Sequence, residues 1–314
     1  MSPALAANIG AVIDQLLGEP PVSVHPVARF GTAMQRIETR TYADRRLNGV
    51  AHLAVGCGLA MSAGFIAKRL LGTTLAAVAA TAFCAAGKML DDEALTIADL
   101  IETDQIESAR ARVRSLIGRN SDALNASELS RGVVESLAEN GVDAVTASLF
   151  WGSVGGAPMV LAHRAINTLD AMVGHRNARY QRFGWASARL DDAVNFIPAR
   201  LGAVGVSLVR PMRARAVFGT IRRDARLHPS PNGGVIEAAF AGALGVRLGG
   251  TNVYGDRVEH RGVLGTGSDP TPADIRAAVT LRRQSTIAVG LTIVAGQMIA
   301  DFILQMVRQR RTTI

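Results

Sequence analysis

Two uncharged runs, separated by a pair of cations, constrain the fold of this chain most strongly. Gly49 to Ala67 is nineteen residues without a formal charge, and after Lys68 and Arg69 the run from Leu70 to Gly87 is another eighteen. A helix of about 20 apolar residues crosses the roughly 30 Å hydrocarbon core of a bilayer. The pair therefore predicts a helical hairpin that crosses the membrane and returns, with a tight turn near Leu71–Thr74.

The composition agrees with a membrane protein. Apolar residues make up 48% of the chain, mean hydropathy is +0.21, and charged residues reach only 19%, below the soluble average of about 25%. A soluble all-α protein with a large core is the alternative. Cys57 and Cys84 both stand in apolar runs, so we interpret them as small buried hydrophobes rather than as a disulfide or a thiolate metal site.

Other apolar segments extend the pattern. Ser285 to Val307 predicts a last span, residues 1–13 a short or interfacial helix, and Gly233 to Val246 a buried or interfacial helix. Ala144 to Ala162 is uncharged but interrupted by Gly155-Gly156-Ala157-Pro158, which indicates a kinked span or two half-helices meeting inside the membrane.

We therefore expect an all-α, polytopic membrane protein. It would have about four to six apolar helices, at least one of them broken or re-entrant, and helical polar loops on the cytoplasmic side. The chain 1–314 would form a single integral-membrane domain, with a soluble acidic helical insertion at 91–143 and a basic Gly/Pro-rich polar region at 210–284. A further helix is expected over about Val27 to Arg40, after three prolines.

The net charge of +8 rests almost entirely on arginine, since Lys68 and Lys88 are the only lysines. Arginine binds phosphate and carboxylate through two parallel donors. Zinc-finger spacing, a basic heptad region and an aromatic RNA-binding motif are absent, so a nucleic-acid partner is not expected. Phosphate-loop, dinucleotide and common hydrolase motifs are absent as well.

A first polar cluster lies in RGVVESLAENGVDA. Glu135 and Glu139 share one helix face, and Asn140 and Asp143 follow. Like charges at this spacing are unfavourable by about 0.2–0.5 kcal/mol unless a cation lies between them. The cluster is either a solvated face or a site for Mg²⁺ or an arginine partner.

A second cluster occupies Asn167 to Arg200, between apolar runs. It is either a positively charged anchoring loop or a binding surface for an anion. An anchoring loop would account for the arginines but not for the Asp and Asn residues between them. Its candidate residues are Asn167, Asp170, His175, Arg176, Asn177, Arg179, Tyr180, Trp185, Arg189, Asp191, Asp192 and Asn195.

A third cluster runs from Arg222 to Asn232 and precedes an apolar helix. Polar, Pro-rich sequence before a helix can present free N–H groups to an anion, or can simply be a helix-entry loop. Its candidates are Asp224, Arg226, His228, Ser230 and Asn232. A weaker candidate is His25, which stands near prolines in LGEPPVSVHPV and is either a ligand or base or part of a structural turn.

At these residues the sequence resembles the CobD/CbiB family, the membrane-bound adenosylcobinamide-phosphate synthases of cobalamin biosynthesis. The resemblance covers most of the chain. It rests on DQLLGEPPVSVHPV, ESLAENGVDAV, GGAPMVLAHRAINTLDAMVGHRN, YQRFGWASARLDDAVNFIPARL and DARLHPSPNGGVIEAAFAGALGVRLGG, in this order. Residues 1–17 offer a shorter first apolar helix than family members usually have.

The resemblance implies an ATP-dependent amide ligation. A propionate carboxylate of adenosylcobyric acid would be joined to (R)-1-amino-2-propanol or its O-phosphate, giving adenosylcobinamide or its phosphate. It implies ATP and Mg²⁺ as cofactors, the corrinoid and the amine as substrates, and the cell (inner) membrane as location. It also leaves room for a complex with other cobalamin-assembly membrane enzymes.

For such a reaction we expect acidic residues to hold Mg²⁺ and arginines to contact phosphates. The metal candidates are Glu135, Glu139, Asp143, Asp191 and Asp192. The catalytic candidates are His175, His228, Asp170 and Asp224. The substrate or phosphate candidates are Asn167, Arg176, Asn177, Arg179, Tyr180, Trp185, Arg189, Asn195, Arg226, Ser230, Asn232 and His25, and Tyr180, Phe183 and Trp185 would pack against the corrin ring.

Such a shared site requires the three clusters to lie on one face of the membrane. If Ala144–Ala162 crossed it completely, Glu139 and Arg179 would lie on opposite sides. We therefore expect this segment to turn back at its Gly-Gly-Ala-Pro break, with the shared face in the cytoplasm. A non-catalytic corrinoid carrier or permease subunit is the alternative function, and a soluble helical phosphate-binding protein is a third.

Overall fold

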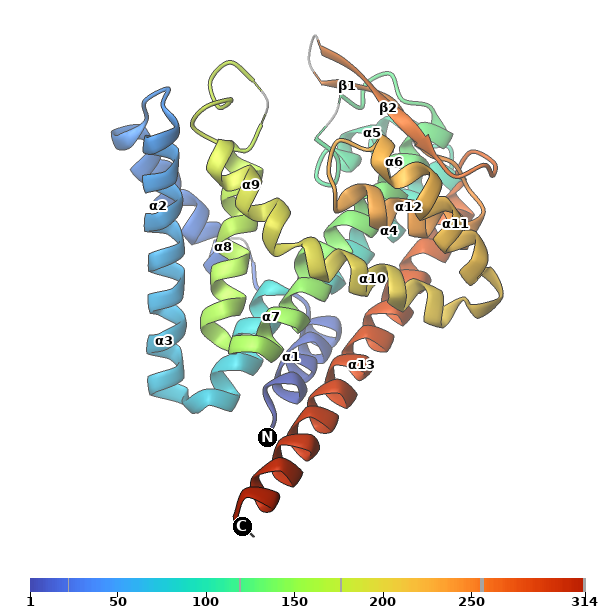
Figure 1. Cartoon of the computed structure of the whole chain (residues 1–314). Helices are drawn as coiled ribbons and strands as arrows, with labels where there is room; N and C mark the ends of the chain where they lie inside the picture. The colour runs from blue at the N-terminus through green and yellow to red at the C-terminus, as the bar shows by residue number, and fades with distance from the viewer. Residues whose placement is uncertain (22, 119, 176, 255–256, 313–314) are drawn as a thin grey trace.

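A computed structural model describes residues 1–314 except 22, 119, 176, 255–256 and 313–314. The described chain is predominantly helical, as expected, and carries one two-stranded sheet (Figure 1). The helices and the sheet surround the end of the molecule where the polar clusters meet, while apolar helices extend away from it.

The predicted hairpin is formed by the two arms of one long helix, which follows two shorter helices. Helix α1 spans Pro3–Leu17 and α2 spans Pro26–Thr41, where the His25 side chain caps the N-terminus and confirms the expected helix near 27–40. Helix α3 spans Arg46–Cys84 and bends at Gly72, whose φ of 77° and ψ of 165° lie outside the helical region. That position suits glycine, and it lies within the predicted turn.

The segment 141–173 enters the apolar region and returns. Helix α6 (Ala126–Asn140) continues through the π-helical turn η1 (Gly141–Thr146) into α7 (Ala147–Gly155). At Gly156 the backbone reverses, with φ 63° and ψ −150°, and α8 (Ala157–Val173) leads back (Figure 1). The predicted reversal at the Gly-Gly-Ala-Pro break is confirmed.

The remaining helices lie beside the hairpin, and one of them, Trp185–Val194, packs against α2, α3 and α8. The remaining helices are α4 (Gly87–Glu102), α5 (Ile106–Val113), α9 (Trp185–Val194), α10 (Phe196–Val209), η2 (Pro211–Arg213), α11 (Ala214–Asp224), η3 (Ala225–Leu227), α12 (Gly233–Leu244) and α13 (Pro272–Thr312). The largest apolar core joins α4, α5, α6, α10, α12 and the start of α13 around buried Ile97, Leu137, Phe240 and Leu281. Residues of 91–143 and 210–284 therefore share one core.

The β-hairpin is the feature that the all-α prediction missed. Strands β1 (Leu248–Tyr254) and β2 (Arg257–Leu264) pair antiparallel, with Leu248 opposite Leu264. These two leucines are buried in the main core. From α6, Arg131 donates to Thr251 O (3.2 Å), and Glu135 Oε1 accepts from Gly249 N at 2.7 Å. The hairpin is thus fixed to α6 by apolar packing and by polar contacts.

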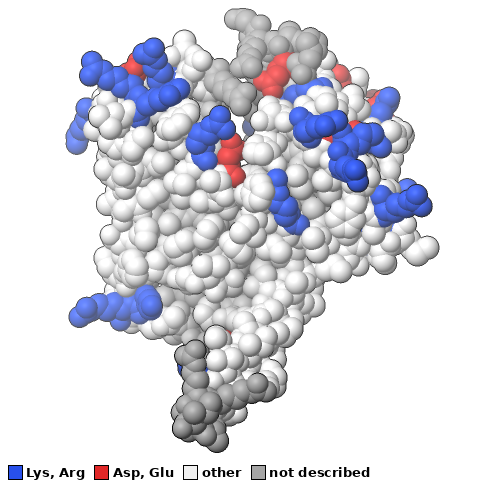
Figure 2. All heavy atoms as spheres, in the orientation of Figure 1, with Lys and Arg blue, Asp and Glu red and all other residues white. Residues whose placement is uncertain are grey.

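Two described helical stretches are long and apolar enough to cross a membrane, Arg46–Glu102 and Pro272–Gln309. The pair α9 and α10, bent by 42°, makes a third if it is counted as one span. Helices α1 and α12 are shorter apolar helices. Figure 2 shows a broad uncharged band over the body of the molecule, with most charged side chains gathered at its upper end. The expected helical membrane fold is confirmed.

Candidate functional site

Carboxylates from three separate parts of the chain meet in one cavity of about 590 Å³, here called the carboxylate cavity. They come from α6, η1, α8 and α9. The cavity is also lined by His175 and Asn177 from the loop after α8, by His228 and Ser230 before α12, and by Glu259 and Arg261 from β2. The expected convergence of the three clusters is confirmed. The helical elements supply five carboxylates, Glu139, Asp143, Asp170, Asp191 and Asp192, and Glu259 from β2 is a sixth.

Side-chain amides hold part of this acidic set in place. Asn167 Nδ2 donates to Asp143 Oδ2 at 3.2 Å and to Asp191 Oδ1 at 3.4 Å. Asn195 Nδ2 donates to the same Asp191 oxygen at 3.1 Å, and its Oδ1 lies 2.8 Å from His163 Nε2. His163 and Asn195 are buried. The chain of contacts fixes Asp191 relative to Asp143, so the predicted polar residues Asn167 and Asn195 position carboxylates.

Crowding and burial oppose the charge of these carboxylates. Burial, and then the nearby Asp191, Asp192 and Glu139, raise the pKa of Asp170 to about 7. Burial and the same neighbourhood raise the pKa of Asp143 well above its usual value. Burial also raises the pKa of Glu139, and Arg261 opposes this shift. A bound cation would favour the ionised form of these carboxylates.

The oxygen atoms that line the carboxylate cavity suit a hard cation such as Mg²⁺. Carboxylate and amide oxygens are the ligands that Mg²⁺ prefers, and it is commonly held by one or two carboxylates together with phosphate oxygens. In the part of the chain that the structure describes, no group of three or more His, Cys, Asp or Glu is arranged as a metal cage. The cavity therefore suits an ion shared with a substrate better than a metal held by protein alone.

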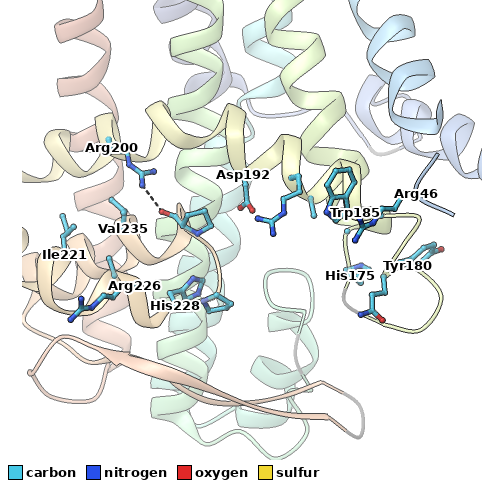
Figure 3. Close-up of a pocket in the computed structure, with 18 of the residues that line it drawn as sticks. Arg46, His175, Tyr180, Trp185, Asp192, Arg200, Ile221, Arg226, His228 and Val235 are labelled. Atoms are coloured by element: carbon cyan, nitrogen blue, oxygen red, sulfur yellow. Dashed lines mark hydrogen bonds between the residues drawn. The ribbon is translucent and has the colours of Figure 1, made fainter. Parts of the chain in front are cut away.

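A larger cavity of about 1130 Å³, the arginine cavity, adjoins the first and shares His175, Asp192 and His228 with it. Figure 3 shows residues from α3, α9, α10, α11 and α12 around it, with Trp185 beside Arg46 and Asp192 between this pair and His228. The Arg46 guanidinium lies 5.0 Å from the centre of the Trp185 ring. Five arginines line the cavity, Arg46, Arg189, Arg200, Arg222 and Arg226.

His228 lines both cavities, and both of its ring nitrogens contact protein groups. Its Nδ1 accepts from Ser230 N at 3.1 Å, and its Nε2 lies 3.4 Å from Glu237 Oε1 and 3.3 Å from Arg261 Nη1. Burial, and then the charge of Arg261, lower the pKa of His228. A neutral imidazole in this wall is suited to proton transfer.

Several predicted residues do line these cavities. Tyr180, Trp185, Arg189 and Arg226 line the arginine cavity, whereas Asn177 and Ser230 line the carboxylate cavity. His175 belongs to both. Arg176 lies outside the described residues.

Other predicted residues have structural contacts instead. Asp224 accepts from Arg223 (2.7 Å) and from Gly265 N (2.9 Å), which ties α11 to the end of β2. Glu135 holds β1, as described above. His25 caps α2 through a bond from Val27 N at 3.2 Å. None of these three lines either cavity among the described residues.

Arg179 and Phe183 also differ from the expectation. Arg179 Nη2 donates to the buried Glu38 at 3.0 Å, and its guanidinium lies over the Tyr42 ring, 4.3 Å from its centre. Phe183 is 0% exposed, so it does not offer a surface to a corrin ring. Asn232 Oδ1 accepts a hydrogen bond from Arg200 Nη1 (2.7 Å), and Asn232 Nδ2 donates to Asp192 O (2.8 Å). These residues shape the loops around the cavities.

Glu259 and Arg261 were not predicted from the sequence. They line the carboxylate cavity because strand β2 carries both of them, and the all-α prediction includes no β-hairpin. The signal was present: Gly255-Asp256 stands between runs in which Val, Tyr and polar residues alternate. Arg46 was missed because it lies at the start of α3, far in the sequence from the predicted clusters, whereas Arg200 and Arg222 stand in the second and third clusters but were not among the candidates named there.

Comparison with known proteins places the chain in a family. The family model described as CobD/Cbib protein matches residues 7–282. The chain is 43% identical over 302 residues to "Cobalamin biosynthesis protein CobD" of Mycobacterium tuberculosis, covering 94% of this chain and 96% of the relative. It is 41% identical over 297 residues to the protein of the same name from Rhodobacter capsulatus, covering 90% and 93%.

A third relative of that name, from Geobacter metallireducens, is 41% identical over 267 residues, covering 81% of this chain and 84% of the relative. No solved structure matches the chain. The family model and these relatives cover most of the chain, and the matched range 7–282 includes all the residues that line the two cavities. The chain therefore belongs to the CobD/CbiB family of cobalamin-biosynthesis proteins.

Proposed function

We propose that this protein catalyses the ATP-dependent ligation of a propionate carboxylate of adenosylcobyric acid to the amine of (R)-1-amino-2-propanol or of its O-phosphate. The observation that carries the proposal is the junction of an acidic cavity and an arginine-rich cavity through a wall that contains two histidines. Membership of the CobD/CbiB family supports a role in cobalamin biosynthesis. The acidic and basic groups at this junction support an ATP-dependent ligation.

A carboxylate must be activated before an amine can attack it. Activation by ATP brings two anions together, so the site has to compensate negative charge and hold both groups in position. One or two of Asp143, Asp170 and Asp191 would hold Mg²⁺ together with phosphate oxygens, and the ion would neutralise charge on those oxygens when bound. Arginines in the adjoining cavity would supply the remaining positive charge.

The amine must lose a proton before it attacks. His175 and His228 lie in the wall between the cavities. His228 is the stronger candidate for the base because burial and Arg261 lower its pKa and keep the imidazole neutral. His228 would accept the ammonium proton at Nδ1 in place of its bond from Ser230 N, and the protonated nitrogen could then donate to Ser230 O, 3.2 Å away.

The polar residues gather at one end of the apolar body, in the same region as the termini of α6, α8 and α9. A permease would carry them along a path near the middle of its spans. This placement supports an enzyme over the corrinoid carrier. We further propose that this end faces the cytoplasm, where ATP is available.

The direct test uses the full chain in detergent or nanodiscs with adenosylcobyric acid, ATP and Mg²⁺. Each amine, free and phosphorylated, is supplied separately, and the amide product is measured by mass spectrometry. We expect product with at least one amine and none when ATP is omitted. Absence of product with both amines would contradict the proposal.

A growth experiment separates the enzyme from the carrier. In a strain without this gene, loss of a ligase is rescued by cobinamide but not by cobyric acid. Equal rescue by the two corrinoids, or failure of both, would favour the carrier.

A further inference from the structure

Among the described residues, none of the five arginines in the larger cavity pairs with an acid, but two of them have other side-chain contacts: Arg46 lies over the Trp185 ring and Arg200 donates to Asn232. Arg189, Arg222 and Arg226 are exposed, and within the part of the chain that the structure describes none of them forms an ion pair. Guanidinium groups gathered in a concave surface repel one another, and a bound anion removes this repulsion. Their arrangement therefore points to an anionic ligand.

Other arginines near this cavity form ion pairs or hydrogen bonds with protein acceptors. Arg223, next to Arg222, pairs with the buried Asp224 at 2.7 Å, and Arg179 pairs with the buried Glu38 at 3.0 Å. Arg200 donates to Asn232 Oδ1 at 2.7 Å and to Pro231 O at 3.2 Å. Arginines with structural roles in this region thus already have acceptors, which distinguishes them from the three unpaired ones.

The three arginines come from different elements and border the same space. Arg189 is on α9, Arg222 on α11 and Arg226 on η3. Arg222 and Arg226 are four residues apart, a spacing that places side chains on one helical face. In Figure 3, Arg226 lies on the same side of the cavity as Ile221 and His228, and Trp185 lies across from it.

The adjoining carboxylate cavity indicates which anion the three arginines would bind. A simple carboxylate ligand would need one arginine fork, whereas phosphate groups offer several oxygens to several donors. The wall shared with the carboxylate cavity would place a phosphate near groups suited to Mg²⁺. Phosphate is the anion that suits both sides of this wall.

We propose that Arg189, Arg222 and Arg226 form a phosphate-binding subsite in the arginine cavity. The two candidate sources of this phosphate, the nucleoside triphosphate and the phosphorylated amine, rest on the proposed function. The subsite leaves the carboxylate cavity free for the cation and the reacting groups.

Direct binding tests this subsite without relying on turnover. The full chain is placed in phosphatidylcholine nanodiscs with a chelator present, so that neither anionic lipid nor metal contributes. Binding of tripolyphosphate, of a non-hydrolysable ATP analogue and of 1-amino-2-propanol O-phosphate is measured by calorimetry. The variants are Arg222→Gln and Arg226→Gln. The matched control is Arg215→Gln, an exposed arginine on the same helix α11 that does not line the cavity.

We expect each cavity variant to weaken binding of at least one probe about tenfold, since it removes a charge-assisted contact. The Arg215 variant should bind like the unmodified protein, and added salt should weaken the specific binding. The probe that loses affinity identifies the phosphate source. Failure of all three probes to bind, or equal binding by all variants, would overturn the subsite.

The binding and ligation results remain separable. Arginine-dependent phosphate binding without any amide product would contradict the proposed ligation and leave the subsite standing. Ligation with unchanged binding in both cavity variants would support the enzyme and overturn the subsite.

Discussion

Asn167 Nδ2 lies 3.2 Å from Asp143 Oδ2, and this contact joins the entry and the exit of the re-entrant segment. Asp143 precedes α7 in the π-helical turn η1, whereas Asn167 lies near the end of α8. π-helical turns often occur at functional sites. The contact therefore brings Asp143 next to the acidic residues of α8 and α9, which no continuous span could do.

Replacing Asp143 by Asn should nearly abolish ligation while preserving the fold. Asn keeps the size of the side chain and an oxygen that can accept from Asn167, but it removes the negative charge. We expect the rate of amide formation, followed by mass spectrometry, to fall about 100-fold or more. Asp269→Asn is the control, because Asp269 is exposed and pairs with Arg247 away from the cavities. An Asp143 variant as active as this control would exclude the carboxylate from the reaction.

The stability of the metal-free protein should depend on the ionisation of Asp170. Its pKa is raised from 3.8 to about 7, so the folded protein binds this proton more tightly than the unfolded chain does. The resulting stabilisation is complete below pH 3.8 and is lost as the pH rises to about 7. In a chelator, the unfolding temperature should fall across this range.

Asp170→Asn should reduce that pH dependence, because the variant has no proton to lose at this position, while Glu139, Asp143 and Asp191, whose pKa values are also raised, account for the remainder. Added Mg²⁺ should raise the unfolding temperature of the unmodified protein most above pH 7, where the carboxylates are ionised. Differential scanning fluorimetry in detergent measures both effects. An identical pH profile for the variant and the parent would show that Asp170 does not titrate in this range.

Patterns within short stretches of sequence predicted most of the fold. The uncharged runs on either side of Lys68 and Arg69 predicted the α3 hairpin, and the Gly-Gly-Ala-Pro break predicted the reversal at Gly156. These features depend on length, hydropathy and the backbone freedom of glycine, which are local properties. The β-hairpin was missed because the polar region 210–284 was interpreted as loops around one apolar helix.

Individual partners were much less predictable. Arg179 stands in a segment rich in candidate phosphate ligands, yet its partner Glu38 lies 141 residues away. Nothing in the spacing of α2 indicates that Glu38 is buried against this loop. The sequence could identify which segments carry polar groups, but only the packing of α2 beside α8 and α9 decides which groups are already paired.

This pairing predicts that Arg179 acts on the loop and not on a ligand. Arg179→Ala and Glu38→Ala should each weaken substrate binding through the loop that carries His175 and Tyr180. The double variant should be no worse than the poorer single variant, because both changes remove one contact. Apparent KM values from the ligation assay measure the effect. Additive losses in the double variant would indicate a separate contact between Arg179 and substrate.

Glu135 should support the site through the β-hairpin. Glu135→Ala removes the acceptor for Gly249 N and leaves a buried donor unsatisfied, at a cost of about 1–3 kcal/mol. Hydrogen exchange in 248–264 should therefore increase, and ligation should weaken because β2 carries Glu259 and Arg261. Glu135→Gln retains an oxygen acceptor and should behave like the parent. If the glutamine variant were as impaired as the alanine variant, the charge of Glu135, and not only its hydrogen bond to Gly249, would be needed for the reaction.

The reversal at Gly156 should tolerate no side chain, although there is room for one. A Cβ built at Gly156 has Ala77 Cβ at 3.9 Å as its nearest neighbour, an ordinary contact. The backbone itself is the obstacle, since φ 63° with ψ −150° is a region that only glycine populates readily. Gly156→Ala should therefore destabilise the protein by about 1–3 kcal/mol.

Gly58→Ala is the matched control for this effect. Gly58 lies inside α3, and a Cβ there meets nothing within 4 Å. Because alanine favours helix by about 1 kcal/mol over glycine, this variant should be neutral or stabilised. Thermal unfolding in detergent compares the two, and the Gly156 variant should also lose ligation as Asp143 and Asp170 move apart. Equal stability of both variants would mean that the reversal does not depend on the conformational freedom of glycine.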